Sequence, residues 1–244
     1  MFIINPYRFT PTGRNIPASP LLYLHAGKAK TGTLPGNNTD PTSTWADLSG
    51  GGYDGSVENA AYTTSSGWAG AGTAGDPYRF KFDGTDDRIK ILYNAGWKPT
   101  TAFTISAWVA AHATNARPFY SCLEGGGFEL TVATTNLFKA RANINGAIRE
   151  VIDTVSYSLD TIYHVMMIYD GSNFRAYKDN VEFGTAVSVT GNVTAFTNNL
   201  YLGCELGSGG ATNHKNSSMY DFRIYNYAFD ESQRAQDYNA GIIF

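Results

Sequence analysis

The sequence is poor in charged residues and contains no run of basic ones. Charged residues make up 16% of the 244 positions, and the formal net charge is −3. Lysine and arginine are scattered, whereas a nucleic-acid-binding face concentrates them, so we expect no nucleic-acid partner. No stretch stays apolar over the length that a bilayer crossing requires, so we expect no membrane insertion.

A secretion signal is also missing from the start of the sequence. The segment MFIINPYRFTPTGR has no basic leading region, a very short apolar run and an early proline, Pro6. We therefore expect a soluble protein without an export signal. An extracellular location would then require release by lysis, assembly into a particle, or a signal that has been removed from the sequence.

Cysteine is nearly absent, and its two occurrences, Cys122 and Cys204, lie far apart. A chain of this length buries roughly 70–75% of the surface that its unfolded form exposes, so it needs no disulfide to hold a core. We expect two reduced, buried thiols. Pairing of the two would require adjacent strands, and the sequence leaves that alternative open.

Aromatic residues and glycine are plentiful. The chain is 43% hydrophobic and 14% aromatic, with 16 Tyr and 26 Gly, a composition typical of a folded β-protein. The first 20 residues differ, because prolines that include Pro6, Pro11 and Pro20 interrupt them and no periodicity is sustained. We interpret residues 1–20 as an extended arm that docks on a neighbouring protein.

Beyond this arm, alternating apolar and polar residues predict β-strands. In residues 102–110 Phe103, Ile105, Ala107 and Val109 fall on one face, which we assign to a core. Residues 203–218 are rich in glycine and predict a flexible rim loop. Three dipeptides with residues that tolerate a left-handed backbone predict tight turns between strands: Asn145-Gly146, Asp170-Gly171 and Asp179-Asn180.

One helix is predicted, over residues 230–239. Asp230 is a suitable N-cap, and Gln233 follows three residues later, as in a capping box. Many short strands with polar connections and one small helix indicate an all-β fold, a two-sheet antiparallel jelly-roll sandwich with a short C-terminal helix. We expect a single domain over residues 21–244.

Seven segments form a recognisable pattern along the chain. They are TWADLSGGGYDGSV (44–57), YRFKFDGTDDRIKI (78–91), FTISAWV (103–109), YHVMMIYDG (163–171), FRAYKDNV (174–181), LYLGCE (200–205) and YDFRIYNYAFDESQ (220–233). Their order and spacing resemble the laminin-G-like, concanavalin A-type lectin/glucanase superfamily over most of residues 21–240. The segment LLYLHAGKAKTG resembles the opening of bacterial and phage members, but His25 stands where an aspartate is usual, so no ligand role is carried over to it.

The acidic segment FDGTDD has two interpretations. As a turn into a strand, Asp83-Gly84 makes the turn, while Asp86 and Asp87 accept backbone N–H groups. The resemblance also implies calcium, which many relatives bind and which prefers clustered carboxylate oxygens. The candidate ligands are Asp83, Asp86 and Asp87, with Asp47 and Asp54 also available.

Catalytic chemistry is not expected. Glycoside hydrolysis needs two carboxylates on one strand face, as in Glu-x-Asp-x-Glu, and the glutamates of this sequence are scattered. His164 lies in a predicted strand without a nucleophile motif, which favours a packed or edge-facing residue over a base. We therefore predict a protein that is not an enzyme.

Aromatic residues in loop-like contexts are the candidates for binding sugar rings. Trp68, Trp97 and Tyr120 are the selected residues, and Tyr53 and Tyr201 are further side chains expected to face outward. The alternative is that the tryptophans, Trp45 included, cover the edges of the sandwich.

Together these features favour a structural or adhesion protein of a tailed bacteriophage, displayed on the virion surface as a capsid-decoration or tail protein. Its expected partners are other virion proteins, bound through the N-terminal arm, and host-surface polysaccharide, bound by the lectin-like domain. A homo-oligomer is expected because virion appendages follow particle symmetry. The alternative is a bacterial carbohydrate-binding module or surface adhesin that is secreted or held at the cell surface.

Overall fold

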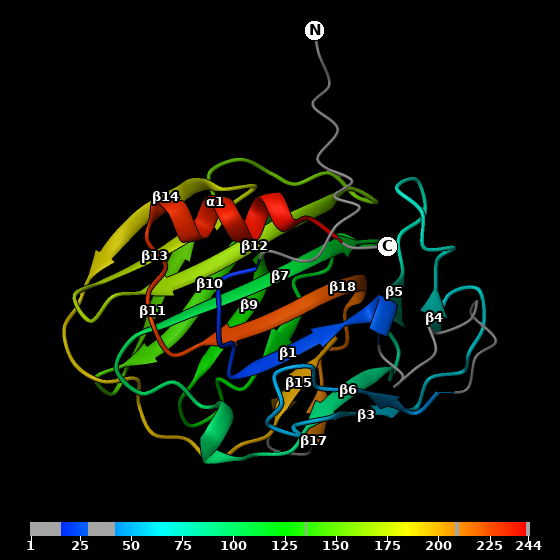
Figure 1. Cartoon of the computed structure of the whole chain (residues 1–244), viewed down its shortest axis with the longest axis horizontal. Helices are drawn as coiled ribbons and strands as arrows, with labels where there is room; N and C mark the ends of the chain where they lie inside the picture. The colour runs from blue at the N-terminus through cyan, green and yellow to red at the C-terminus, as the bar shows by residue number, and fades with distance from the viewer. Residues whose placement is uncertain (1–15, 29–41, 135, 208–209, 243–244) are drawn as a thin grey trace, which may run out of the picture.

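A computed structural model describes residues 16–28, 42–134, 136–207 and 210–242. Two antiparallel sheets of eight strands each are stacked with a hydrophobic core between them (Figure 1). We call the sheet that carries the C-terminal helix the helix-side sheet, and the other the opposite sheet. The predicted all-β, two-sheet jelly-roll sandwich is confirmed.

The helix-side sheet has the order β14 (Val181–Ser188), β13 (Asn173–Lys178), β12 (Ile162–Tyr169), β7 (Phe103–Ala111), β18 (Asn216–Tyr225), β5 (Arg79–Asp83) and β4 (Gly67–Ala69). Strand β1 (Leu22–His25) pairs with the second half of β18, beyond the residues that pair with β5. The central strands are thus brought together from both ends and the middle of the chain.

The opposite sheet has the order β11 (Ala147–Ile152), β10 (Leu137–Ile144), β9 (Phe128–Ala133), β8 (Tyr120–Ser121), β15 (Leu200–Leu202), β6 (Arg88–Ile91), β3 (Gly55–Glu58) and β2 (Thr44–Trp45). Two 3-10 turns, η1 (Ala26–Lys28) and η2 (Ala95–Trp97), lie in connections. The rim-loop prediction for residues 203–218 is wrong, because β16 (Glu205–Gly207) pairs with β17 (Gly210–Thr212) and β18 begins at Asn216.

The predicted turns close the hairpins as expected. Asn145 and Gly146 both have positive φ, 54° and 76°, between β10 and β11. Asp179 and Asn180 have φ of 52° and 65° between β13 and β14. Two consecutive left-handed residues match the twist of a two-residue hairpin, which is why these dipeptides are informative.

The C-terminal helix α1 (Glu231–Ala240) confirms the prediction for residues 230–239. The Asp230 side chain accepts the Gln233 N–H, and the Gln233 side chain accepts the Asp230 N–H, which completes a capping box. In Figure 1 the helix, in red, lies across the face of the helix-side sheet near β12.

The helix explains why β7 is buried on both faces. All nine residues of Phe103–Ala111 are buried, although the alternation assigns only one face to the sandwich core. On the other face the Trp108 ring stacks on Tyr238 of α1, with centroids 5.8 Å apart and planes 12° apart. The helix therefore adds a second, smaller hydrophobic layer outside the sheet.

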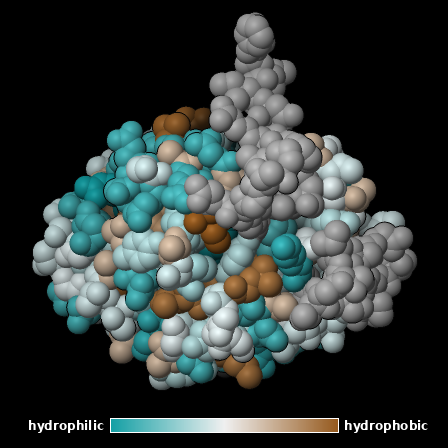
Figure 2. All heavy atoms as spheres, viewed as in Figure 1, coloured by the Kyte–Doolittle hydropathy of each residue, from teal (hydrophilic) through white to brown (hydrophobic). Residues whose placement is uncertain are grey.

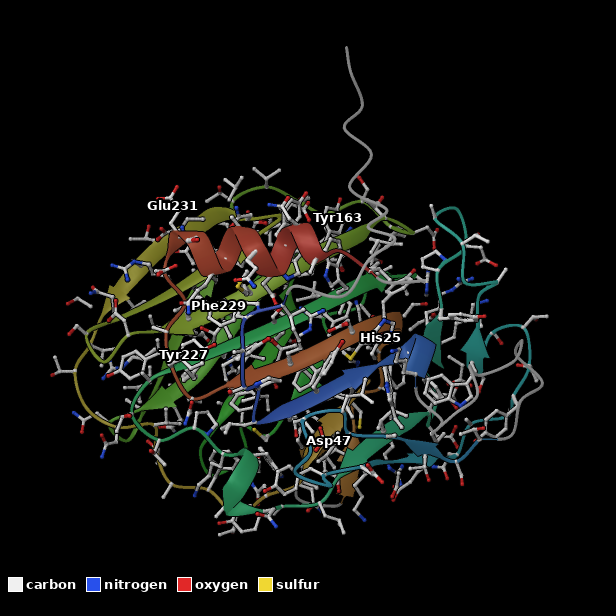
Figure 3. All side chains as sticks on the ribbon, in the orientation of Figure 1. His25, Asp47, Tyr163, Tyr227, Phe229 and Glu231 are labelled. Atoms are coloured by element: carbon white, nitrogen blue, oxygen red, sulfur yellow. The ribbon has the colours of Figure 1, made fainter. Side chains whose placement is uncertain are left out.

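Of the predicted N-terminal arm, residues 1–15 lie outside the described residues. In the part that is described, the Tyr227 hydroxyl donates to the Ala18 carbonyl at 2.8 Å, so this segment lies against the strand-to-helix connection (Figure 3). Cys122 and Cys204 are both buried and free, as predicted. Within the described residues no helix has the length and apolar character to cross a membrane.

Candidate ligand-binding site

The aromatic residues selected as sugar platforms are in the core. Trp68, Trp97 and Tyr120 each have 0% of their surface exposed, so the prediction that they offer a ring to solvent is wrong. The Trp68 and Trp97 indoles donate to the carbonyls of Thr42 and Leu92, at 2.8 and 2.9 Å. Trp68 lies in strand β4 and Trp97 in the 3-10 turn η2, and the two carbonyls satisfy their indole N–H groups inside the core.

A buried polar network lies beneath α1. The Ser106 hydroxyl is 2.8 Å from His164 Nε2 and 2.5 Å from the carboxylate of Asp237 on α1. Asp237 also pairs with Arg223, which pairs in turn with Asp221. All five side chains are at most 1% exposed, so this serine, histidine and aspartate have no access to a substrate. The network holds the helix on the sheet, and it confirms that His164 is a packed residue.

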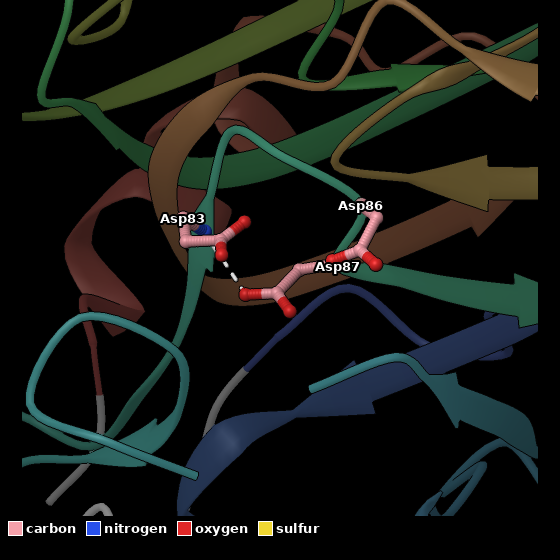
Figure 4. A group of neighbouring side chains, drawn as sticks. All are labelled: Asp83, Asp86 and Asp87. Carbon is pink, nitrogen blue, oxygen red and sulfur yellow. Dashed lines mark hydrogen bonds between the residues drawn. The ribbon is translucent and has the colours of Figure 1, made fainter. Parts of the chain in front are cut away.

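The acidic turn between β5 and β6 brings three carboxylates together (Figure 4). One oxygen from each of Asp83, Asp86 and Asp87 lies within 4.8 Å of the others. Gly84 has φ of 82° and Asp87 Oδ2 accepts the Asp83 N–H, as the turn interpretation predicts. The other carboxylate that accepts a backbone N–H is Asp83, from Thr85, and not the predicted Asp86. Asp87 Oδ1 is buried and accepts no hydrogen bond from the described residues.

This position disfavours the charged form of the Asp87 carboxyl group. Burial raises its pKa to about 6, with further raising by the charges of Asp83 and Asp86 and partial compensation by the Asp83 N–H and Ser66. Asp47 and Asp54 are not part of the cluster. The Asp47 carboxylate accepts the N–H groups of Tyr23, Ser49 and Tyr53, which ties its loop to β1 (Figure 3).

The outer face of the opposite sheet carries a polar row that follows the strand register. Its members pair across neighbouring strands in the order Ser56, Lys90, Tyr201, Ser121, Glu129, Arg141 and Glu150. Arg141 donates to Glu129 and Glu150, both at 2.9 Å. Burial raises the pKa of Glu129, although Arg141 opposes the shift. The charges in this part of the row already satisfy one another.

A polar cavity of about 520 Å³ opens on the outer face of the helix-side sheet. It lies beside β5 and the first half of β18, where Tyr220 packs with Trp108 and Ile242. A β-bulge in β18 between Met219 and Asp221 shifts the register at Tyr220, and such bulges redirect side chains. The lining residues are Thr64, Ser65, Gly75, Asp76, Pro77, Arg79, Lys81, His112, Asp160, Ile162, Asn216 and Tyr220.

One wall of the cavity is cationic. Arg79 Nη1 donates to Asp76 at 2.6 Å and to the Pro77 carbonyl at 2.9 Å. Lys81 Nζ donates to the Thr64 carbonyl at 2.6 Å. Burial lowers the pKa of Lys81, and the neighbouring charge of Arg79 lowers it further, while Asp76 opposes the shift.

The facing wall is held by a chain of hydrogen bonds. His112 Nδ1 is 2.6 Å from Asp160 Oδ1, and His112 Nε2 is 2.7 Å from the Ser218 hydroxyl. An aspartate, a histidine and a serine linked in this order also form the catalytic triad of many hydrolases. Here, however, Ser218 is fully buried and does not line the cavity. The chain fixes the orientation of the imidazole and leaves no nucleophile open to a ligand.

No local sequence pattern predicted this cavity. Its walls come from segments more than 150 residues apart, and the positions of His112 and Asn216 carry no spacing signal. The one available signal was Arg79-x-Lys81, two cations on the same face of a predicted strand.

Comparison with known proteins places this fold in a family. A sequence model of the concanavalin A-like lectin/glucanase superfamily matches residues 83–233. The chain belongs to this superfamily. A search of curated protein sequences found no match.

Solved structures of superfamily-like folds cover nearly the whole chain. The binding domain of Paraclostridial Mosquitocidal Protein 1 superposes with a TM-score of 0.67 at 13% identity, over 91% of this chain and 52% of that one. A structure of botulinum neurotoxin type C, whose cell entry depends on interaction with two ganglioside molecules, superposes with a TM-score of 0.62 at 14% identity, over 93% of this chain and 52% of that one. A Trypanosoma rangeli sialidase in complex with sialic acid superposes with a TM-score of 0.61 at 15% identity, over 96% of this chain and 36% of that one. The chain spans about half of these proteins or less, and the identities of 13–15% mean that the superpositions show its fold alone.

Proposed function

We propose that this chain is a glycan-binding module and that the cavity on the helix-side sheet holds the sugar. The observation that carries the proposal is the cavity itself, about 520 Å³ in volume and lined mainly by hydrogen-bonding side chains. A volume of this size suits a small ligand, and a polar lining suits one with many hydroxyl groups. Membership in a lectin/glucanase superfamily and solved neighbours that bind gangliosides or sialic acid support the assignment.

Binding without chemical conversion is the activity proposed. Within the described residues, the cavity lining contains Asp76 and Asp160, and each is already bonded to a cation or an imidazole on its own wall. Glycoside hydrolysis requires two carboxylates that flank the scissile bond from opposite sides with different protonation. We expect no release of reducing sugar from any glycan that binds.

The cavity can be closed by one substitution. Gly75 lines it, a Cβ added there meets no atom within 4 Å, and its backbone is not left-handed. Gly75→Trp should therefore fill the cavity and leave the fold intact. Ser56→Trp places the same side chain on an exposed position of the opposite sheet and serves as the control.

The test is a glycan panel followed by calorimetric titration of each hit. We expect saturable binding by the wild-type chain and the Ser56→Trp variant, and at least a tenfold weaker interaction with Gly75→Trp, about 1.4 kcal/mol or more. Equal binding by the wild type and both variants would show that the site lies outside the cavity. Absence of any binding would overturn the proposed function.

Calcium is a separate proposal. The fit is supported by three carboxylates within 4.8 Å of one another and by the buried, unbonded Oδ1 of Asp87, because calcium prefers such oxygen ligands. Asp83, Asp86 and Asp87 would hold the ion, which would screen their mutual repulsion. Calcium should raise the melting temperature of the wild type and of Asp54→Asn, but not of Asp86→Asn. Equal melting temperatures in calcium and in chelator would remove the proposal.

Display on a phage particle remains the favoured biological setting, with a bacterial adhesin as the alternative. The proposal is supported by the arm-like sequence of residues 1–20 and by the lectin-like domain that follows it. Antibody labelling of purified particles in electron micrographs would test it. Unlabelled particles, together with labelled bacterial cells, would favour the adhesin.

A further inference from the structure

We propose that the cavity selects an acidic sugar, one whose ring carries a carboxylate, and that Lys81 and Arg79 bind this carboxylate. The inference rests on the proposed glycan-binding function and specifies its ligand class. It is carried by the arrangement of charge on the cavity walls.

The two cations share one wall because of strand geometry. Arg79 and Lys81 are two residues apart on β5, so their side chains leave the same face of the sheet. Phe80 and Phe82 alternate with them and are buried in the sandwich core. The alternation therefore directs both positive groups toward the cavity.

Lys81 is a cation without a carboxylate partner. Its ammonium donates to the Thr64 carbonyl, and it forms no ion pair with any described residue. Lys81 lies on the same face of β5 as Arg79, and both side chains line the cavity. An anion bound beside Lys81 would supply the carboxylate partner that the ammonium lacks among the described residues, which gives the site a physical reason to prefer one.

Arg79 is oriented by Asp76 and keeps donors for a ligand. Both of its hydrogen bonds come from Nη1, to Asp76 and to the Pro77 carbonyl. Nε and Nη2 make no hydrogen bond to the described residues. Because a guanidinium presents a rigid fork of donors, anchoring one corner orients the others for a carboxylate oxygen.

The other charged groups of the cavity do not cancel this preference. The lining holds two cations, Arg79 and Lys81, two carboxylates, Asp76 and Asp160, and the imidazole of His112. Asp76 pairs with Arg79, and Asp160 is hydrogen-bonded to His112 on their own wall. Lys81 is the charged side chain of the lining that has no side-chain partner among the described residues. We therefore place the sugar carboxylate at β5 and the ring hydroxyls toward Asn216 and the His112 wall.

The experiment compares an acid with its own ester. The probes are methyl β-D-glucuronide and the α-methyl glycoside of N-acetylneuraminic acid, each beside its methyl ester, titrated calorimetrically into the full chain. The ester keeps every ring hydroxyl, removes the negative charge and adds one methyl group, so the Lys81 variants below separate the effect of charge from that of size. We expect at least one acid to bind about tenfold or more tightly than its ester, as a charge-assisted hydrogen bond requires.

Variants assign the effect to Lys81. Lys81→Met should reduce binding of the acid to the level of the ester, while Lys81→Arg should retain most of the preference. Lys90→Met, on the outer face of the opposite sheet, is the matched control and should leave the preference unchanged. Melting temperatures of all variants establish that they are folded.

The outcomes separate this inference from the proposed function. If acid and ester bind equally and Gly75→Trp weakens both, the cavity binds sugar without discriminating by charge. The inference is then overturned, while the proposed function stands. If the preference for acid survives in Lys81→Met, the carboxylate lies elsewhere and the inference is also overturned. If neither acid, ester nor any neutral glycan binds, both proposals are overturned.

Discussion

The carboxylate of Asp237 on α1 and the guanidinium of Arg223 on β18 form an ion pair in which neither side chain is exposed. Arg223 is held from its other side by Asp221, 2.7 Å away. Although burial alone would raise it, the charge of Arg223 holds the pKa of Asp237 well below its ordinary value, with help from His164 and Ser106. This pair joins the helix to the sheet through the interior.

Removing one partner of this pair should be costly. Asp237→Asn leaves Arg223 buried with only Asp221 as counter-charge, and we expect a loss of about 3–5 kcal/mol in the free energy of unfolding. Glu231→Gln, an exposed position in the first turn of the same helix, should lose less than about 1 kcal/mol. Chemical denaturation measures both. Equal losses would show that the buried pair has no special role.

The same pair predicts a loss of stability in acid. Because the pKa of Asp237 is lower in the folded than in the unfolded chain, its contribution is complete above the unfolded value of about 4 and declines as the pH falls below it. Denaturation curves between pH 5 and 2 should show wild-type stability falling more steeply than that of Asp237→Asn. Parallel curves would contradict the assignment.

Asp87 has the opposite effect on the pH dependence of stability. Its folded pKa of about 6 exceeds the ordinary value of 3.8, so the folded chain retains a proton that the unfolded chain has released. Stability should therefore fall as the pH rises from about 4 to 6, by at most about 3 kcal/mol. Asp87→Asn, measured in chelator, should remove this fall because the amide oxygen can still accept the Asp83 N–H. A fall of the same size in the variant would point to another group.

The tryptophans should report a closed core. All four, Trp45, Trp68, Trp97 and Trp108, have 0% of their surface exposed. We expect short-wavelength emission, weak quenching by acrylamide in the native state, and a several-fold rise in quenching on unfolding. Strong native-state quenching would show that at least one ring is accessible and would restore Trp68 or Trp97 as a sugar platform.

Local sequence signals were sufficient for many strands, the tight turns and the helix of this fold, although they missed the β16–β17 hairpin. The alternation in β7, the Asn145-Gly146 turn and the Asp230 cap each act within a few residues, and the structure confirms them. The turn at Asp83-Gly84 belongs to the same class. Backbone chemistry of this kind depends little on distant contacts.

Whether an individual side chain is buried or exposed depended on contacts with distant segments, which no local sequence pattern contains. Trp68 is buried because its ring packs against Trp45 and Phe80 of other strands, while the Thr42 carbonyl accepts its indole N–H. Trp108 is buried because a helix 130 residues later covers it. The cavity joins β5, β18 and the start of β12, with a bulge at Tyr220 that alternation does not reveal. Polar side chains in these segments gave no sign that they would meet.

The surface gives little support to a hydrophobic docking face in the view of Figure 2. Hydrophobic side chains, in brown, form small separate patches among hydrophilic ones. This distribution agrees with a ligand that is bound through hydrogen bonds and charge rather than through a broad apolar contact.

The most direct measurement is a map of backbone amide shifts during titration of the isotope-labelled chain with a glycan that binds. We predict that the largest changes lie around Lys81, Asn216 and Tyr220, and that the Gly75→Trp variant shows none of them. Changes centred on Lys90, Ser121 and Tyr201, on the outer face of the opposite sheet, would contradict the assignment of the cavity as the glycan site.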